Sequence, residues 1–189
     1  IIAFALILCG NWFALSISVR EIVSEKDLLT QEFRKGMPVF SLLCAKSSVS
    51  LLFSFVQITL CYLCFGPFLE ISPALIPLLL IALTTLLPAI ASGLFMSTIS
   101  KNAGQANAFL PLLIIPQVAL TGALIPLDQM QTIGRAISTI IWSRYNQNAL
   151  QNLFTQTPIS SLNIIIPLII AILIYIITLF MLYNLKKSK

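Results

Sequence analysis

Residues 163–185 read NIIIPLIIAILIYIITLFMLYNL, a stretch of 23 residues without a charged side chain. A helix needs about 20 mainly apolar residues to cross the ~30 Å hydrocarbon core of a bilayer. Lipid offers no hydrogen-bond partner to an open backbone, so this stretch predicts a transmembrane helix. Lys186, Lys187 and Lys189 follow at once, which is typical of a cytoplasmic helix end.

Four more apolar runs lie upstream, at residues 1–19, 47–68, 73–99 and 106–126. The whole chain is 58% hydrophobic and only 9% charged, whereas an ordinary soluble domain is about 25% charged. This composition excludes a solvated globular domain, and it also excludes a disordered chain, since so much apolar surface needs burial. We therefore expect an all-α integral membrane protein with five transmembrane helices.

The basic residues divide unequally between the two sides that five spans define. Nine of the 11 fall in segment 20–46, in segment 100–105 or in the C-terminal tail: Arg20, Lys26, Arg34, Lys35, Lys46, Lys101, Lys186, Lys187 and Lys189. Only Arg135 and Arg144 fall on the other side. The positive-inside rule makes the side with nine cytoplasmic, which places the N-terminus outside and the C-terminus inside. The net charge of +5 thus indicates membrane topology, and no nucleic-acid partner is expected.

The first apolar run has neither a preceding Met nor a basic flank, unlike a secretory signal peptide. We expect residue 1 to lie inside a helix that starts further upstream, and the chain to be the C-terminal part of a longer protein.

Residues 20–35 read REIVSEKDLLTQEFRK and predict an amphipathic helix that continues from the first span. Ile22, Leu29 and Phe33 share one face of this helix, and Gly36 and Pro38 end it. We expect a cytoplasmic surface that docks a partner. The alternative is a helix lying among lipid headgroups, although its four acidic residues oppose contact with an anionic surface.

Residues 127–162 predict a small outer cap that dips back towards the membrane. One short helix is indicated by Ile133, Ile137 and Ile140, and a second is expected at residues 146–154. Trp142 and Tyr145 suit the membrane interface. A disordered outer loop is the alternative.

The residues that catalysis and ion coupling need are missing from the sequence. The chain has no histidine, no phosphate-binding GxxxxGK[ST] loop, no GxSxG and no HExxH. The spans hold no charge at their centres, which argues against an ion-coupled transporter. Cys9, Cys44, Cys61 and Cys64 lie in or beside apolar segments and are expected to be apolar filler. We therefore expect no enzyme, metal or cofactor site in this chain, and an energy source outside it.

Three stretches resemble the membrane domain of type-2 ABC exporters, most closely the ABCG, or white/pigment-pump, branch. The first is SEKDLLTQE at residues 24–32, followed by GM at 36–37 and AK at 45–46. The second is NAGQANA at residues 102–108, followed by PLL at 111–113. The third runs from TGAL at residues 121–124 through RY at 144–145 to AL at 149–150. In a six-helix domain of that kind, the five spans would be helices two to six.

The resemblance implies a single permease domain over residues 1–189, driven by an ABC ATPase that lies upstream or on a partner chain. ATP and Mg would bind to that ATPase and not here. A second copy of the permease domain would complete the substrate pathway. The implied contacts with the ATPase are Glu25, Glu32 and Arg34; the implied pathway residues are Asn11, Phe13, Ile115 and Val118; the implied outer gate is Ala123 and Leu124.

Two alternatives stay open at this stage. The chain could be a related type-2 permease that exports polysaccharide or lipid-linked glycan. Such a permease would need a wide pathway lined with aromatic residues, for which Trp12 and Phe13 alone are thin support. It could also be a membrane fragment or scaffold that transports nothing.

Overall fold

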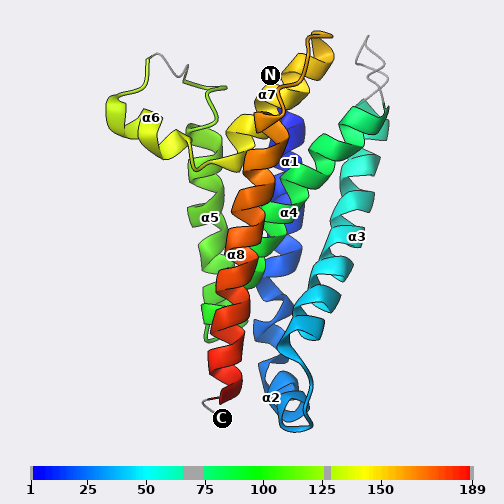
Figure 1. Ribbon diagram of the computed structural model, residues 1–189, viewed down its shortest axis with the longest axis vertical. Helices are drawn as coiled ribbons and strands as arrows, with labels where there is room; N and C mark the ends of the chain where they lie inside the picture. The colour runs from blue at the N-terminus through cyan, green and yellow to red at the C-terminus, as the bar shows by residue number, and fades with distance from the viewer. Residues whose placement is uncertain (1, 66–74, 126–128, 188–189) are drawn as a thin grey trace.

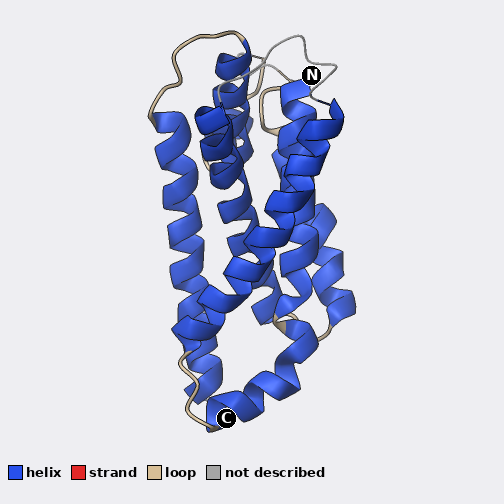
Figure 2. Ribbon diagram, turned by 90° about the vertical axis from the view of Figure 1, so that its right-hand side faces the viewer, coloured by secondary structure: helices blue, strands red, loops and turns tan. Residues whose placement is uncertain are grey.

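The computed structural model describes residues 2–65, 75–125 and 129–187, and these fold into helices joined by loops and turns (Figures 1 and 2). In chain order the elements are α1 (Ile2–Glu21), the short 3₁₀ helix η1 (Val23–Glu25), α2 (Lys26–Arg34), α3 (Val39–Phe65), α4 (Leu75–Ile99), α5 (Ala103–Ala119), α6 (Thr132–Ser138), α7 (Trp142–Phe154) and α8 (Leu162–Lys187). No strand occurs among these residues.

The long helices run along one axis, so the molecule has two ends (Figure 1). One end carries α2 and the C-terminal end of α8, and the other carries α6, α7 and the start of α1. We call them the α2 end and the α7 end. Helix α4 is central: α1 and α8 pack mainly against it, α3 lies against α1 and α4, and α5 lies against α1. This arrangement separates the basic segments, since Lys26, Lys101 and Lys186 lie towards the α2 end and Arg135 and Arg144 towards the other.

The α1–α4 contact is close because small residues meet there. A Cβ atom added at Gly93 of α4 would collide with the side chain of Ser18 on α1. Around this contact Leu15, Leu86 and Leu94 are fully buried. Small residues that let backbones approach are a common basis of helix association in membranes.

The apolar runs all form helices, with boundaries that differ from the predicted ones. Among the described residues, four helices are long and apolar enough to cross a membrane, and these are α1 (with its extension through α2), α3, α4 and α8. The fifth apolar helix, α5, begins at Ala103 and ends at Ala119, whereas the predicted span was 106–126. It starts early because the Asn102 side chain caps it, accepting a hydrogen bond from the Gln105 amide at 2.8 Å. That the chain crosses the membrane five times stays a prediction.

Two predicted connections also change. Helix α3 begins at Val39 and not at residue 47, so residues 39–46 belong to a helix. The predicted single helix over residues 20–35 is interrupted by η1. Helix α2 then ends as predicted, with Gly36 at a φ of 96° that favours glycine. The predicted end of the span at residue 68 and the predicted start of the next at residue 73 lie outside the described residues.

The outer segment forms two helices and not a disordered loop over its described part. Helix α6 matches the first expected helix. Helix α7 begins four residues before the predicted residue 146 and buries Trp142, Asn146 and Leu150. It packs against α8, α4 and α1. The sequence suggested a small outer cap that dips back towards the membrane, and in the structure α7 packs into the bundle.

Candidate functional site

The first cluster lies at the α2 end, where α1 gives way to α2. The amides of Ile22 and Val23 both donate to the Ser97 hydroxyl on α4, each at 3.0 Å. Ser97 is fully buried. A buried amide without a partner is costly, so this hydroxyl lets the helix break without leaving two amides unpaired. The break is therefore fixed by a side chain 75 residues away in sequence.

Ion pairs hold the same junction from the α3 side. Lys46 Nζ lies 2.6 Å from a Glu25 carboxylate oxygen and 3.2 Å from one of Glu21. The two acidic residues are four apart and would repel each other in an isolated helix. Lys46 lies between them and removes that repulsion. On the other side, Lys26 donates to the Ser100 carbonyl at 3.0 Å. We call Glu21, Glu25, Lys26, Lys46 and Ser97 the junction cluster.

The second cluster is polar, buried and nearer the α7 end. Asn11 of α1 donates to the Ser143 hydroxyl at 2.8 Å and accepts from the Trp142 indole at 2.8 Å. Ser143 in turn donates to Gln117 of α5 at 2.6 Å. These side chains are all 6% exposed or less. Each one finds a partner, as buried polar groups require.

A second pair joins α7 to α4. Asn146 and Thr84 exchange two hydrogen bonds: the Thr84 hydroxyl donates to the Asn146 side chain at 2.9 Å, and the Asn146 amide donates to the Thr84 carbonyl at 3.1 Å. Together with Asn11, Gln117, Trp142 and Ser143 we call this set the outer network. It bonds α7 to α1, α4 and α5.

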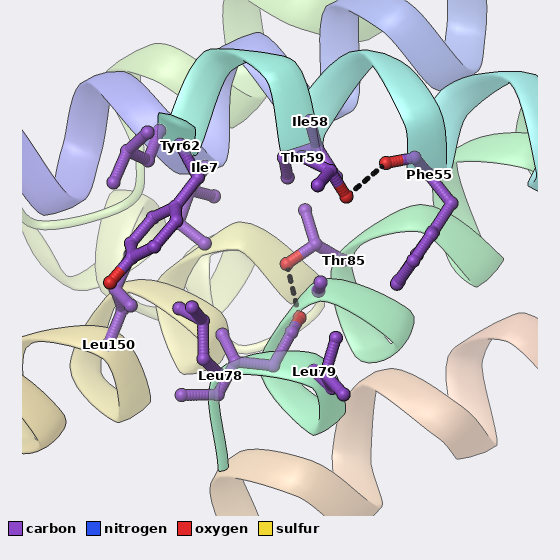
Figure 3. A pocket seen from close by; sticks show the side chains of 12 residues that line it. Ile7, Phe55, Ile58, Thr59, Tyr62, Leu78, Leu79, Thr85 and Leu150 are labelled. Carbon is purple, nitrogen blue, oxygen red and sulfur yellow. Dashed lines mark hydrogen bonds between the residues drawn. The ribbon is translucent and has the colours of Figure 1, made fainter. Parts of the chain in front are cut away.

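An apolar pocket of about 100 Å³ lies beside the outer network (Figure 3). Side chains of α1, α3, α4 and α7 line it, among them Ile7, Tyr62, Leu78 and Leu150. The lining hydroxyls of Thr59 and Thr85 donate to carbonyls of their own helices, at 2.7 and 2.8 Å. Since these polar groups are already paired, the pocket suits hydrocarbon.

The described ranges contain no group of three Cys, Asp or Glu side chains that could hold a metal ion. The chemistry of both clusters is hydrogen bonding and ion pairing between helices. Such contacts position helices relative to one another.

Comparison with known families decides what kind of membrane protein this is. Residues 1–155, most of the chain, match the ABC-2 type transporter family. The chain belongs to this family. It is a multi-pass membrane domain of a transporter, a permease component and not a catalytic one. No curated protein and no solved structure matches the chain significantly.

The matched region of this ABC-2 domain includes the residues expected to contact the ATPase, and the structure separates them. Glu25 points into the junction cluster and bonds Lys46. Glu32 is half-buried, and Arg34 is exposed on α2. Asp27, Leu28 and Gln31 are also exposed there, and sequence reasoning did not single them out. The spacing of Ile22, Leu29 and Phe33 marks the buried face of this helix. It could have identified the three exposed residues, since these lie on the opposite face.

The expected pathway residues fall on neighbouring helices of the ABC-2 domain but in different surroundings. Asn11 is fully buried in the outer network, Phe13 and Val118 are half-buried, and Ile115 is 63% exposed. Asn11 and Phe13 are two residues apart and point to different sides, as helical geometry requires.

The two expected gate residues follow α5 in a bent segment. Ala123 and Leu124 are both exposed, and Gly122 before them has a φ of 87°. Gln117 and Ser143, which join α5 to α7, were not predicted as a pair. Their separation of 26 residues carries no periodic signal.

Proposed function

We propose that this chain is the permease half of an ATP-driven exporter of the ABCG-like type, in which α2 is the coupling helix. The observation that carries the proposal is the position of α2. It lies at the basic end of the bundle, buries Leu29 and leaves Leu28 52% exposed. ABC-2 membrane domains typically work with an ABC ATPase, and that ATPase would dock on this end from the cytoplasm.

The contacts of α2 suggest how the docking side chains divide their roles. Leu29 belongs to the apolar core that includes Ile22, Leu94 and Leu182. A push on α2 would therefore reach α4 and α8. Glu25, already held by Lys46, would keep the base of α2 in place, while Glu32 and Arg34, with Leu28, would face the ATPase. The C-terminus lies at the same end and would be cytoplasmic.

The proposed pathway lies on the α1–α5 side, between this domain and a second copy. Phe13, Ile115 and Val118 would contribute side chains to it, and Asn11 would act on it through α7. Ala123 and Leu124 would close it at the outer end. The side chains of Trp12 and Ile115 are both at least half exposed. This supports a surface there that is left open for a second copy of the domain.

The docking test uses the transporter assembled with its ATPase. Leu28→Cys should cross-link to the ATPase with a bismaleimide in membranes, in a background without other reactive cysteines. Leu162→Cys is the matched control, because this exposed leucine lies at the start of α8, towards the opposite end. A cross-link from Leu162→Cys but not from Leu28→Cys would refute docking on α2.

Coupling is tested with a charge reversal. Glu32→Lys should uncouple ATP hydrolysis from export while leaving the folded protein intact, because Glu32 is only half-buried and has a helical position that tolerates lysine. Gln31→Lys, an exposed neighbour, separates a local effect from a general change of charge. Unchanged stimulation of hydrolysis and unchanged export in Glu32→Lys would remove Glu32 from the coupling surface.

A further inference from the structure

One side chain ties the last turn of α8 to the end of α2, and both lie at the same end of the molecule (Figure 1). Lys186 Nζ donates a hydrogen bond to the Met37 carbonyl at 2.7 Å, although the two residues are 149 positions apart. The same ammonium group lies 5.8 Å from the centroid of the Phe33 ring, within the range of a cation–π contact. Lys186 is half-buried by these contacts.

The carbonyl that accepts this bond is fixed to α2. The Met37 amide donates back to the Glu32 carbonyl at 3.1 Å, and the Gly36 amide donates to the Phe33 carbonyl at 3.1 Å. Gly36 lies between them at a φ of 96°, so these bonds close the helix as a glycine cap does. The Lys186 ammonium is therefore attached to the end of a helix and not to a loose loop.

Apolar side chains also lie between α2 and α8, but their packing is incomplete. Leu29 and Leu182 are buried in the same core, and Phe33 and Leu185 pack against it. A cavity of about 30 Å³ remains between these four side chains. Apolar contact is non-directional and would let one helix slide along the other, whereas the hydrogen bond of Lys186 has one acceptor and one direction.

The next residue offers a direct comparison. Lysines at a cytoplasmic helix end commonly extend to the lipid headgroups, and Lys187 is exposed as that role requires. Both lysines carry the same charge at the same helix end, so both interact favourably with the helix dipole. What distinguishes Lys186 is its bond to the end of α2.

We propose that Lys186 is a positioning residue for coupling, which makes the last turn of α8 follow α2 when the ATPase closes. This inference rests on the proposed docking of the ATPase on α2. Helix α8 packs along α4 and against α7, so a displacement of α2 would enter the bundle through α8 as well as through the junction cluster.

The test measures hydrogen–deuterium exchange in the whole transporter, assembled with its ATPase in lipid nanodiscs. The first condition is without nucleotide. Lys186→Met keeps an unbranched apolar side chain and should speed exchange at the amides of residues 35–37 by about tenfold, the effect of losing one hydrogen bond from a charged donor. Exchange in the centre of α4 should stay unchanged, which shows that the fold is intact.

The second condition adds ATP and vanadate, which trap the ATPase in its closed state. In the wild type, exchange should change in α2 and at residues 183–187 together. In Lys186→Met, α2 should still respond, while the response at residues 183–187 should fall by about five- to tenfold. A general loss of stability would alter both regions in both conditions, so it is distinguishable from lost transmission.

Two further variants complete the test. Lys187→Met removes the same charge and should behave like the wild type. Lys186→Arg should restore the response, because a guanidinium can donate to the carbonyl and stack on the Phe33 ring. A response at residues 183–187 that is equal in Lys186→Met and the wild type, or missing in the wild type while α2 responds, would overturn the role of Lys186. No response of α2 in the wild type would refute the docking on α2, and this inference with it.

Discussion

At the scale of single residues, Ser97 and Asn11 show how a small polar side chain can determine the course of a membrane helix. Each lies on one helix and forms hydrogen bonds with groups of another part of the chain. The Ser97 hydroxyl accepts hydrogen bonds from the backbone amides of Ile22 and Val23, just after α1. Asn11 forms hydrogen bonds with Trp142 and Ser143 at the start of α7.

Ser97→Ala should loosen the junction between α1 and α2. The amides of Ile22 and Val23 would lose their acceptor while staying buried, at a cost of about 1–3 kcal/mol. We expect a lower melting temperature and faster hydrogen exchange at these two amides. Ser92→Ala is the control, since the Ser92 hydroxyl bonds only the Pro88 carbonyl of its own helix. Equal behaviour of the two variants would contradict the role of Ser97.

Asn11→Leu should destabilise the contact between α1 and α7. The Trp142 indole would lose its acceptor and Ser143 one of its partners, each loss costing about 1–3 kcal/mol. A double-mutant cycle with Ser143→Ala, followed by thermal unfolding, measures the coupling. Additive effects of the two substitutions would show that the bond contributes no stability.

The family resemblance implied Asn11 as a pathway residue, and the sequence could not predict its surroundings. Its partners are 131 and 132 residues away, and no periodic pattern links such distant positions. The acidic pair Glu21 and Glu25 was visible in the sequence as a local repulsion. The residue that offsets this repulsion is Lys46, and its position depends on how α3 packs against α1.

At the scale of elements, hydrophobicity and length predicted the helices, whereas tertiary contacts and caps set their ends. The apolar runs became α1, α3, α4, α5 and α8, with caps such as Asn102 moving the ends by a few residues. The break at η1 was not predictable, since residues 20–35 form a regular amphipathic pattern and the interrupting hydroxyl comes from α4. Helix α7 was predicted only as part of an outer cap that dips back towards the membrane, because the hydrogen bonds of Ser143 and Asn146 to other helices depend on tertiary packing.

Gly93→Ala should weaken the packing of α1 on α4. The added methyl group would collide with Ser18, and overpacking of this kind typically costs about 1–3 kcal/mol. Adding Ser18→Gly should restore part of the loss, because it removes the atoms that collide. Gly134→Ala is the control, as its new Cβ would lie 3.8 Å from the nearest atom outside the local backbone. Thermal unfolding of the wild type and these three variants in detergent tests this, and a Gly93→Ala protein as stable as Gly134→Ala would refute it.

At the scale of the whole molecule, the unequal charge of the two ends predicts its orientation. Ser24 at the α2 end and Thr139 near the α7 end are both exposed. In a background without other reactive cysteines, Thr139→Cys should react with an impermeant maleimide in intact cells. Ser24→Cys should react only in inside-out vesicles, because the basic end stays in the cytoplasm. The reverse pattern would place the C-terminus outside.

Helix α4 is bonded to α7 through Thr84, in its first half, and to the junction between α1 and α2 through Ser97, near its C-terminal end. These residues are 13 positions apart, which is about 20 Å along a helix axis. Pro88 lies between these two residues and cannot donate a hydrogen bond to the backbone one turn earlier, so it weakens the helix between its two contacts. If the proposed docking on α2 is right, a displacement at the junction would reach α7 through α4, and the stiffness of this connection would depend on Pro88.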